Sequence, residues 1–299
     1  MNRRPGTDAT RGVLSALDWR TLRVRRNMFG VQSALLVALV VLALGPLLLL
    51  AKFAVTPTQD ILRTPLAFFP NGVAWENLHA AWFDVQIGLY FTNTVVIAVG
   101  SWVAQIIIAT TGGYVLSILR PRYAKLLNAA VLGTLFIPGI VLLVPLYLTI
   151  LDPPGPLGSL LNTYWAIWLP AAATAFNVVL VKRFFDNLPT EILEAARVDG
   201  AGPFRLFWYL VLPMSRPILG VVSVFAVIAS WKDFLWPLLV LTRPELQPLS
   251  VRLPTLQATT DLGTLMAGLA ISTVIPIVFF LVFQRLFLRG AGLSGAIKG

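Results

Sequence analysis

Six long apolar stretches, separated by shorter polar segments, constrain the fold of this 299-residue chain more than any other feature. They lie near residues 31–51, 90–117, 127–150, 164–181, 217–240 and 266–284. Each is close to or above the about 20 residues that an α-helix needs to cross the hydrocarbon core of a bilayer. Only 12% of the residues are charged, about half the fraction found in soluble domains. The sequence therefore predicts an all-α, polytopic membrane protein with six transmembrane helices.

The positions of Lys and Arg predict how these helices are oriented. Of the 23 basic residues, 18 lie in the N-terminal segment, in the loops 119–125 and 182–216, or at the C-terminal end. Short cytoplasmic loops carry an excess of Lys and Arg, so both termini are expected in the cytoplasm. The expected parts are a basic cytoplasmic tail (1–30), a six-span domain (31–290) with an outer loop (52–89) and a cytoplasmic loop (182–216), and a cytoplasmic C-terminal tail (291–299).

The composition excludes several classes of function. Cysteine is absent and His79 is the only histidine, which excludes disulfides, thiolate catalysis and multi-histidine metal centres. The formal charge of +10 follows from the basic loops and needs no nucleic acid partner. None of the patterns G-x-x-x-x-G-K-S/T, H-E-x-x-H and G-x-S-x-G occurs in the sequence. The chain is therefore expected neither to be an enzyme nor to bind ATP itself.

The longest cytoplasmic segment, residues 182–216, contains the signals for two short helices joined by a turn. The first helix is expected to begin after Pro189 and to end at Gly200, a favourable residue just beyond a helix. The second is expected to begin at Pro203, a favourable first-turn residue, and to stop at Pro213. From this pattern alone the segment could dock on another protein or lie on the membrane surface beneath its own helices.

Three short motifs in this segment carry a resemblance to a known family: Glu194-Ala195-Ala196, then Gly200, then Leu210-Val211-Leu212-Pro213. They resemble the EAA loop of binding-protein-dependent ATP-binding-cassette (ABC) importers, whose pattern is Glu-Ala-Ala, three residues, Gly, nine residues and Ile-x-Leu-Pro. Both spacings are kept, with Leu210 in the Ile position. Over residues 55–299 the chain is similar to the smaller permease of maltose-type carbohydrate importers, in stretches that include YFTNTVVIA, LLNTYWAIWLP and SWKDFLWPLLVL.

The resemblance implies a type I ABC importer permease fold, with residues 182–216 as a coupling-helix finger. It implies a heterodimer with a second permease, two copies of an ABC ATPase, and an extracytoplasmic solute-binding protein or lipoprotein, all at a bacterial plasma membrane. ATP and Mg would be bound by the ATPase subunits, and no cofactor by this chain. The expected solute is a carbohydrate; glycerol phosphate or another polyol, and a non-transport membrane scaffold, are the alternatives. By resemblance, the residues that contact the ATPase are expected to be Glu194, Ala195, Ala196, Asp199, Gly200, Leu210, Leu212 and Pro213.

Four residues in the spans are candidates for the wall of a translocation path: Asn177, Trp231, Lys232 and Asp233. Lys232 stands where the resembled group usually has Asn, about two-thirds of the way out along the fifth predicted span. A charge inside a membrane is costly, so Lys232 is expected either to snorkel to the outer interface or to line a water-filled cavity. Hydrogen bonds between helices are expected for three further polar residues: Gln105, Thr174 and Ser230.

Overall fold

The computed structural model describes residues 22–65, 67, 72–156 and 158–292, and every regular element in these ranges is helical. The longer elements are α1 (Leu22–Ala54), α4 (Ile87–Tyr114), α5 (Ala124–Thr134), α6 (Leu143–Leu151), α7 (Trp165–Ala172), α8 (Ala175–Asp186), α9 (Thr190–Val198), α12 (Arg216–Lys232), α14 (Leu249–Leu256) and α15 (Leu262–Gly292). The shorter ones are α2 (Thr58–Arg63), α3 (Glu76–His79), α10 (Pro203–Arg205), α11 (Leu212–Met214) and α13 (Leu235–Val240). Single turns of π- or 3-10-helix join some of these: η2 (Ala80–Asp84), η3 (Val115–Leu119), η4 (Gly139–Leu142), η5 (Leu206–Val211) and η6 (Pro244–Leu246).

Two segments of the described chain are long and apolar enough to cross a bilayer without a break. They are Met28–Ala54 within α1 and Ile87–Leu119, which joins α4 to η3. The second has 33 residues, which accounts for the unusual length of the apolar stretch 90–117. Residues 22–30, assigned above to the N-terminal tail, form the first turns of α1. The rest of that tail, and residues 293–299 of the C-terminal tail, lie outside the described residues.

Two of the remaining spans are bent pairs of helices where the sequence predicted single crossings. The stretch 127–150 turns by 100° between α5 and α6, and the stretch 164–181 bends by 42° between α7 and α8. A proline explains each bend, because proline has no N–H for the carbonyl four residues earlier and disfavours a helical residue before it. Pro138 ends the loop after α5, and Pro170 lies in α7 just before its end.

The fifth predicted span, 217–240, is wrong as a single helix. Its main part is α12, which ends at Lys232; Asp233 is extended at ψ 123°, and the chain resumes as the separate short helix α13. Pro237 accounts for the break, since it cannot donate a hydrogen bond to the carbonyl of Asp233. Lys232 therefore ends a helix and does not lie two-thirds of the way along one.

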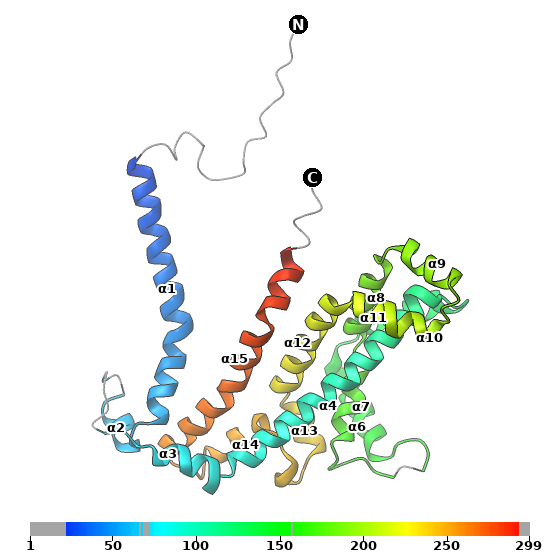
Figure 1. Cartoon of the computed structure of the whole chain (residues 1–299). Helices are drawn as coiled ribbons and strands as arrows, with labels where there is room; N and C mark the ends of the chain where they lie inside the picture. The colour runs from blue at the N-terminus through cyan, green and yellow to red at the C-terminus, as the bar shows by residue number, and fades with distance from the viewer. Residues whose placement is uncertain (1–21, 66, 68–71, 157, 293–299) are drawn as a thin grey trace.

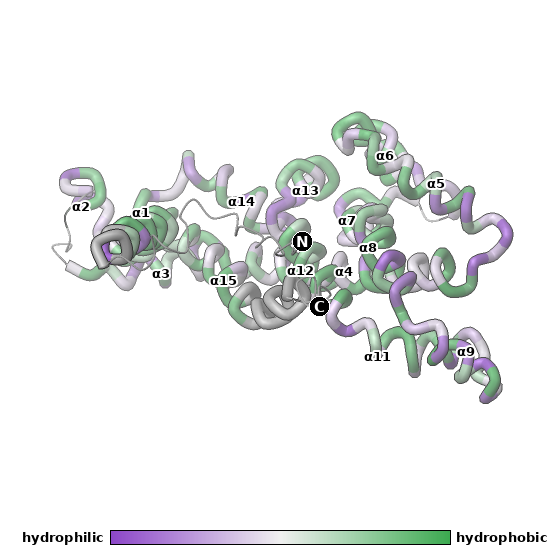
Figure 2. Tube along the Cα trace, turned by 90° about the horizontal axis from the view of Figure 1, so that it is seen from above, coloured by the Kyte–Doolittle hydropathy of each residue, from purple (hydrophilic) through white to green (hydrophobic). Residues whose placement is uncertain are grey.

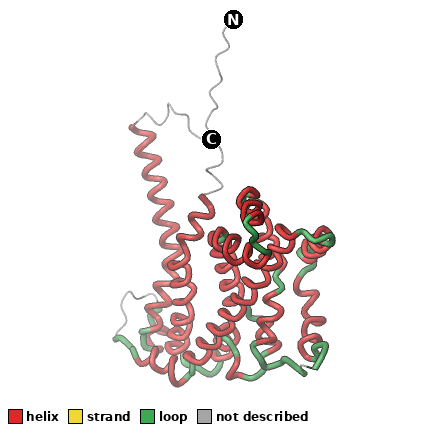
Figure 3. The backbone as a smooth tube through the Cα atoms, turned by 45° about the vertical axis from the view of Figure 1, so that its right-hand side comes forward, coloured by secondary structure: helices red, strands yellow, loops and turns green. Residues whose placement is uncertain are grey.

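The long helices run between two opposite sides of the molecule. The start of α1, the described end of α15 and the helix α9 lie on one side, and α2, α3 and α14 lie on the other (Figure 1). In Figure 3, turned by 45° about the vertical axis, the two ends of the described chain again lie on the same side. Seen from above, α1 and α2 lie at one end of an elongated arrangement and α5, α6 and α9 at the other, with apolar residues along the long helices (Figure 2). This arrangement is the one expected if the basic loops share one side of a membrane.

Helix α4 is the centre of the packing, in contact with α7, α8, α12 and α14. Two of its glycines allow the neighbouring helices to come close. A Cβ atom at Gly100 would lie 2.1 Å from the Trp168 ring, and one at Gly113 would lie 2.9 Å from Val181. Small residues at such positions are typical of helices that associate in lipid. The close contact of α4 with α7 and α8 therefore depends on glycine.

Candidate functional site

Helix α9, which carries the predicted coupling residues, ends in a tight left-handed turn. The N–H of Gly200 donates to the carbonyl of Arg197 at 3.0 Å, and the N–H of Ala201 donates to that of Ala196 at 2.9 Å. With Gly200 at φ +82°, this pair of bonds closes the helix as a Schellman motif. Pro203 then begins a second helical segment, which runs to Met214, one residue past the predicted end. Residues 190–214, called the finger below, are thus two helical pieces joined by a defined turn.

The inner face of the finger is anchored to the ends of α4 and α8. Leu193 is only 6% exposed and belongs to one buried cluster with Phe185 and Phe207. The hydroxyl of Tyr114 in α4 donates to the carbonyl of Pro203 at 2.7 Å, and the rings of Tyr114 and Phe207 lie 5.0 Å apart. Close-packed contacts of this kind transmit displacement. A force on the finger would therefore reach α4 and α8 directly.

The outer face of the finger is exposed, although much of it is apolar. Val198 is 88% exposed, Phe204 75% and Tyr209 79%. Glu194 and Ala195 are also exposed and lie one helical turn before Val198, on the same face of α9. Apolar side chains gathered on an exposed surface indicate a site of protein interaction. The small side chain of Ala195 would let a partner approach the backbone closely.

The predicted coupling residues divide into two groups in the structure. Glu194, Ala195, Asp199, Gly200 and Pro213 are exposed, whereas Ala196, Leu210 and Leu212 are half-buried against the cluster that anchors the finger. The second group therefore supports the finger from within and offers less surface to a partner. This division depends on which residues pack against the buried cluster, and the motif alone does not show that packing.

A polar cluster, not predicted from the sequence, lies beside the finger where α8 meets the loop after α4. Asp186 accepts a hydrogen bond from Lys182 at 2.7 Å and one from Ser117 at 2.7 Å, and its carboxylate lies 3.6 Å from the Arg120 guanidinium. These contacts join α8 to η3 and to the basic loop 119–125. The Lys182–Asp186 spacing of four residues on one helix was the only sequence signal for the cluster.

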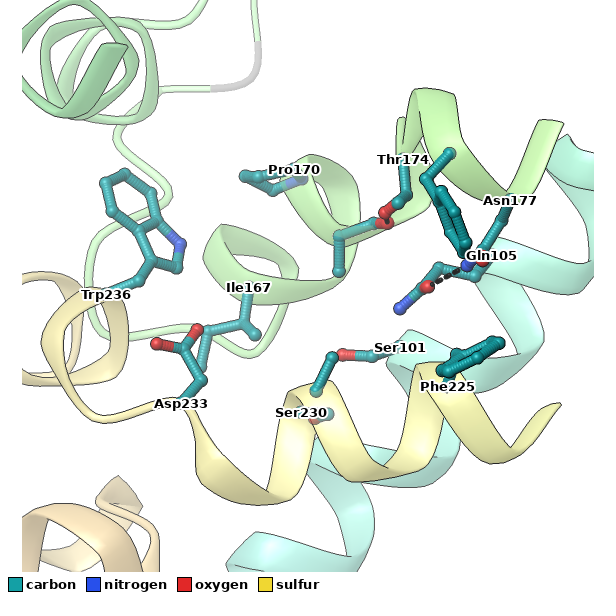
Figure 4. Close-up of a pocket in the computed structure, with 13 residues that line it drawn as sticks. Ser101, Gln105, Ile167, Pro170, Thr174, Asn177, Phe225, Ser230, Asp233 and Trp236 are labelled. Atoms are coloured by element: carbon teal, nitrogen blue, oxygen red, sulfur yellow. Dashed lines mark hydrogen bonds between the residues drawn. The ribbon is translucent and has the colours of Figure 1, made fainter. Parts of the chain in front are cut away.

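A cavity of about 450 Å³ lies away from the finger, between α4, α7, α8 and α12 (Figure 4). Asp233 and Trp236 lie at one end of it, and Asn177 and Phe225 at the other. Its volume is within the range of about 300–1,000 Å³ that is usual for small-molecule sites. Residues of the described chain that line it are Ser101, Gln105, Ile167, Pro170, Ala171, Thr174, Phe176, Asn177, Phe225, Ala229, Ser230, Asp233 and Trp236.

Two broken helices border this cavity, and the carbonyls that their prolines leave unpaired are taken by other elements. Pro170 cannot donate to the carbonyl of Ala166, which instead accepts a hydrogen bond from the Trp236 indole N–H at 2.9 Å. Pro237 cannot donate to the carbonyl of Asp233, which accepts one from the Ser250 hydroxyl at 2.7 Å. Non-helical backbone at membrane depth is tolerated only where it is buried in protein or lines a cavity. The two helix breaks therefore lie in the cavity wall, where other elements take the place of the missing backbone donors.

The structure separates the four predicted path residues. Asn177 and Asp233 line the cavity, and the Asn177 amide donates to Gln105 at 2.7 Å, the expected kind of bond between helices. Trp231 is half-buried and faces away, with its ring 6.5 Å from that of Phe91 in an edge-on contact. Lys232 is exposed at the end of α12 and is not among the residues described as lining the cavity. Sequence reasoning missed Ser101, because a lone serine in an apolar stretch gives no signal.

Comparison with known proteins identifies relatives over nearly the whole length. Residues 109–291 match the family model described as "Binding-protein-dependent transport system inner membrane component". The sn-glycerol-3-phosphate transport system permease protein UgpE of Yersinia pestis is 30% identical over 84% of this chain and 91% of its own. The lactose transport system permease protein LacG of Rhizobium radiobacter is 28% identical over 93% and 99%. A crystal structure of a bacterial ABC transporter that imports the acidic polysaccharide alginate contains a chain with the same fold, with a TM-score of 0.80, 22% identity and coverage of 89% and 98%.

Proposed function

The chain belongs to the binding-protein-dependent transport system inner membrane component family and is a permease subunit of an ABC importer, and from this premise we propose that its finger docks on the ATPase and drives transport. Permease subunits of this family are not catalytic, and ATP is hydrolysed by partner subunits. The contact would be made by the exposed residues Glu194, Ala195, Asp199 and Gly200. Ala196, Leu210 and Leu212 would hold the finger in place.

The observation that carries this proposal is the two-sided character of the finger. Its inner face is packed against α4 and α8 through Leu193 and Tyr114. On its outer face, Val198 and Tyr209 remain exposed within the described chain. Burial of such apolar area on a partner is favourable by about 25 cal/mol per Å². A surface that is both exposed and rigidly supported is suited to transmit the movement of a bound partner to the helices behind it.

In the proposed assembly, both termini and the finger are cytoplasmic and the six spans pair with those of a second, different permease. Two copies of the ATPase bind ATP and Mg, and an extracytoplasmic binding protein or lipoprotein delivers the solute to the side where α2, α3 and α14 lie (Figure 1). Closure of the ATPases would push the finger. The 79° bend between residues 203–214 and α12 would convert this push into rocking of α12, with alternating access to a central path.

The proposed solute is a carbohydrate delivered by the binding protein. The resemblance to maltose-type permeases supports this choice, and so does LacG, whose name gives lactose as its solute. UgpE carries sn-glycerol-3-phosphate by its name and is similar to this chain to about the same degree, so glycerol phosphate is the second candidate. Overall sequence identity does not distinguish a carbohydrate from glycerol phosphate as the solute. The residues that line the cavity provide a second criterion.

Replacement of Ala195 tests the docking surface. Ala195→Asp places a charge where a close contact would bury it, at a cost of several times the thermal energy, whereas Ala195→Ser keeps the size and carries no charge. Because Ala195 is exposed and outside the apolar spans, both variants should reach wild-type levels in the membrane with the second permease. We expect Ala195→Asp, and not Ala195→Ser, to lose the ATPase on co-purification. Retention of the ATPase by Ala195→Asp would refute the docking site.

A further inference from the structure

Three polar atoms in the wall of the cavity are buried and have no hydrogen-bond partner in the described part of the chain. They are the hydroxyl oxygens of Ser101 and Ser230 and the side-chain oxygen of Asn177. A buried polar atom without a partner costs about 1–3 kcal/mol, and native proteins contain few of them. Three such atoms around one cavity are therefore poorly explained by folding alone, and they point to a ligand that completes their bonds.

The neighbouring residues define what such a ligand must carry. The Asn177 amide nitrogen donates to Gln105, which leaves the Asn177 oxygen as an unpaired acceptor within the wall (Figure 4). The serine hydroxyls can donate or accept, and the carboxylate of Asp233 accepts. A compound with several hydroxyl groups can both donate and accept at these positions. The mixture of acceptors and donors fits hydroxyls better than a group that only accepts.

The charge of the wall argues against a phosphate ester. Among the described lining residues there is no Lys, Arg or His, and the one ionisable group is the carboxylate of Asp233. Phosphate recognition typically uses Arg or Lys, and a nearby carboxylate repels the anion. The apolar part of the wall includes three aromatic rings: those of Phe176 and Phe225 meet edge to face at 5.7 Å, and Trp236 lies at the other end.

We infer that this subunit itself contacts the transported solute in the cavity, through Ser101, Asn177, Ser230 and Asp233, and that the solute is an uncharged polyhydroxyl compound. The inference rests on the proposed function, because it takes the cavity to be part of the transport path. It adds to that function the residues that contact the solute and the solute's lack of charge. It also decides between the two solute candidates, in favour of an uncharged sugar over glycerol phosphate.

A cysteine introduced in place of Ala229 can report whether the cavity is filled. Ala229 is exposed and lines the cavity, and the chain has no other cysteine to react. Ala173→Cys is the matched control, since Ala173 is exposed near the same helix break but is not among the described lining residues. The complete transporter, co-expressed with its partner subunits, is labelled with a water-soluble methanethiosulfonate. Labelling is repeated with a panel of uncharged mono- and disaccharides, lactose among them, and with sn-glycerol-3-phosphate.

Two serine variants in the Ala229→Cys background separate ligand binding from folding. Ser101→Ala removes a hydroxyl that has no partner, so it should leave thermal stability unchanged or raised while it weakens binding. Ser223→Ala removes a hydroxyl that accepts from Trp102 at 2.7 Å and donates to Leu219 at 2.7 Å, outside the cavity. It should lower thermal stability without an effect on the ligand. The two variants therefore have opposite expected signatures.

We expect at least one uncharged sugar to protect the thiol of the Ala229→Cys variant and not that of the Ala173→Cys variant, and Ser101→Ala to raise the half-protecting concentration about tenfold. The inference is overturned if no sugar in the panel protects, if sn-glycerol-3-phosphate protects instead, or if Ser101→Ala leaves the half-protecting concentration unchanged. ATP hydrolysis by the Ala195→Asp complex is measured in parallel. Loss of stimulation there, together with no protection by sugar, would refute the cavity assignment alone and leave the proposed function standing.

Discussion

Replacement of Gly200 isolates the contribution of the turn that closes α9. Gly200 is at φ +82°, a conformation that costs a residue with a side chain roughly 1–2 kcal/mol. No atom lies within 4 Å of the position that a Cβ would take, so the cost comes from the backbone and involves no clash. Gly200→Val should carry the full cost, because a β-branched residue is the least tolerant of this region. Gly200→Asn should carry much less, since Asn adopts the left-handed conformation more readily.

A cost of roughly 1–2 kcal/mol would reduce the population of the native turn by a factor of roughly 5–30 relative to alternatives. The turn lies outside the apolar spans, so both variants should insert and assemble at wild-type levels. The assay is ATP hydrolysis in proteoliposomes, with and without solute-loaded binding protein. We expect weak stimulation for Gly200→Val and near-normal stimulation for Gly200→Asn. Equal, wild-type stimulation in both would show that the geometry of the turn does not matter for coupling.

Three further predictions concern the orientation and the outer side of the molecule. In intact cells, an impermeant thiol reagent should label Val73→Cys and not Val198→Cys; the reverse pattern would invert the topology. Lys232→Asn should leave uptake kinetics unchanged, because Lys232 is exposed at the end of α12 and is not among the described residues that line the cavity. A changed KM would show that Lys232 contributes to the translocation path. Burial raises the pKa of the Asp261 carboxyl, but hydrogen bonds from Thr264, Thr58 and the backbone N–H of Gly263 outweigh this effect and hold the pKa below its usual value. The stability that ionised Asp261 contributes is therefore present above about pH 4 and lost as the pH falls through its folded pKa. The difference in thermal midpoint between wild type and Asp261→Asn should accordingly be present at about pH 7 and shrink below about pH 4; a difference that grew on acidification would contradict this.

The sequence predicted the helical pieces of the finger well, because their signals are local. Pro189, Gly200 and Pro203 each act through the conformation of their own residue or its immediate neighbours, and the structure begins and ends helices where they predict. Apolar length located the long helices for the same reason. What failed was the continuity of the spans. A hydropathy window does not register that Pro138 or Pro237 removes a backbone donor from an otherwise apolar stretch.

The cavity was only partly predictable, since it depends on contacts between distant segments. Asn177 and Asp233 were visible as polar residues in apolar stretches, and both line it. Lys232 had the same appearance, but the break after it directs Asp233 to the cavity and leaves Lys232 exposed. Ser101 gives no local signal and becomes notable only when the structure leaves its hydroxyl buried without a partner. Such a feature requires three-dimensional packing to detect.

The central claim is that the finger transmits the work of ATP hydrolysis to the spans, and solute-dependent ATPase activity tests it most directly. The measurement compares wild type, Ala195→Ser and Ala195→Asp in the reconstituted transporter with loaded binding protein, and follows uptake alongside hydrolysis. We predict that Ala195→Ser matches wild type in both hydrolysis and uptake. Ala195→Asp should assemble in the membrane but lose both stimulated hydrolysis and uptake, because a desolvated charge would stand at the docking contact. Wild-type stimulation and uptake by Ala195→Asp would contradict the account and leave the finger as a structural feature of the cytoplasmic surface.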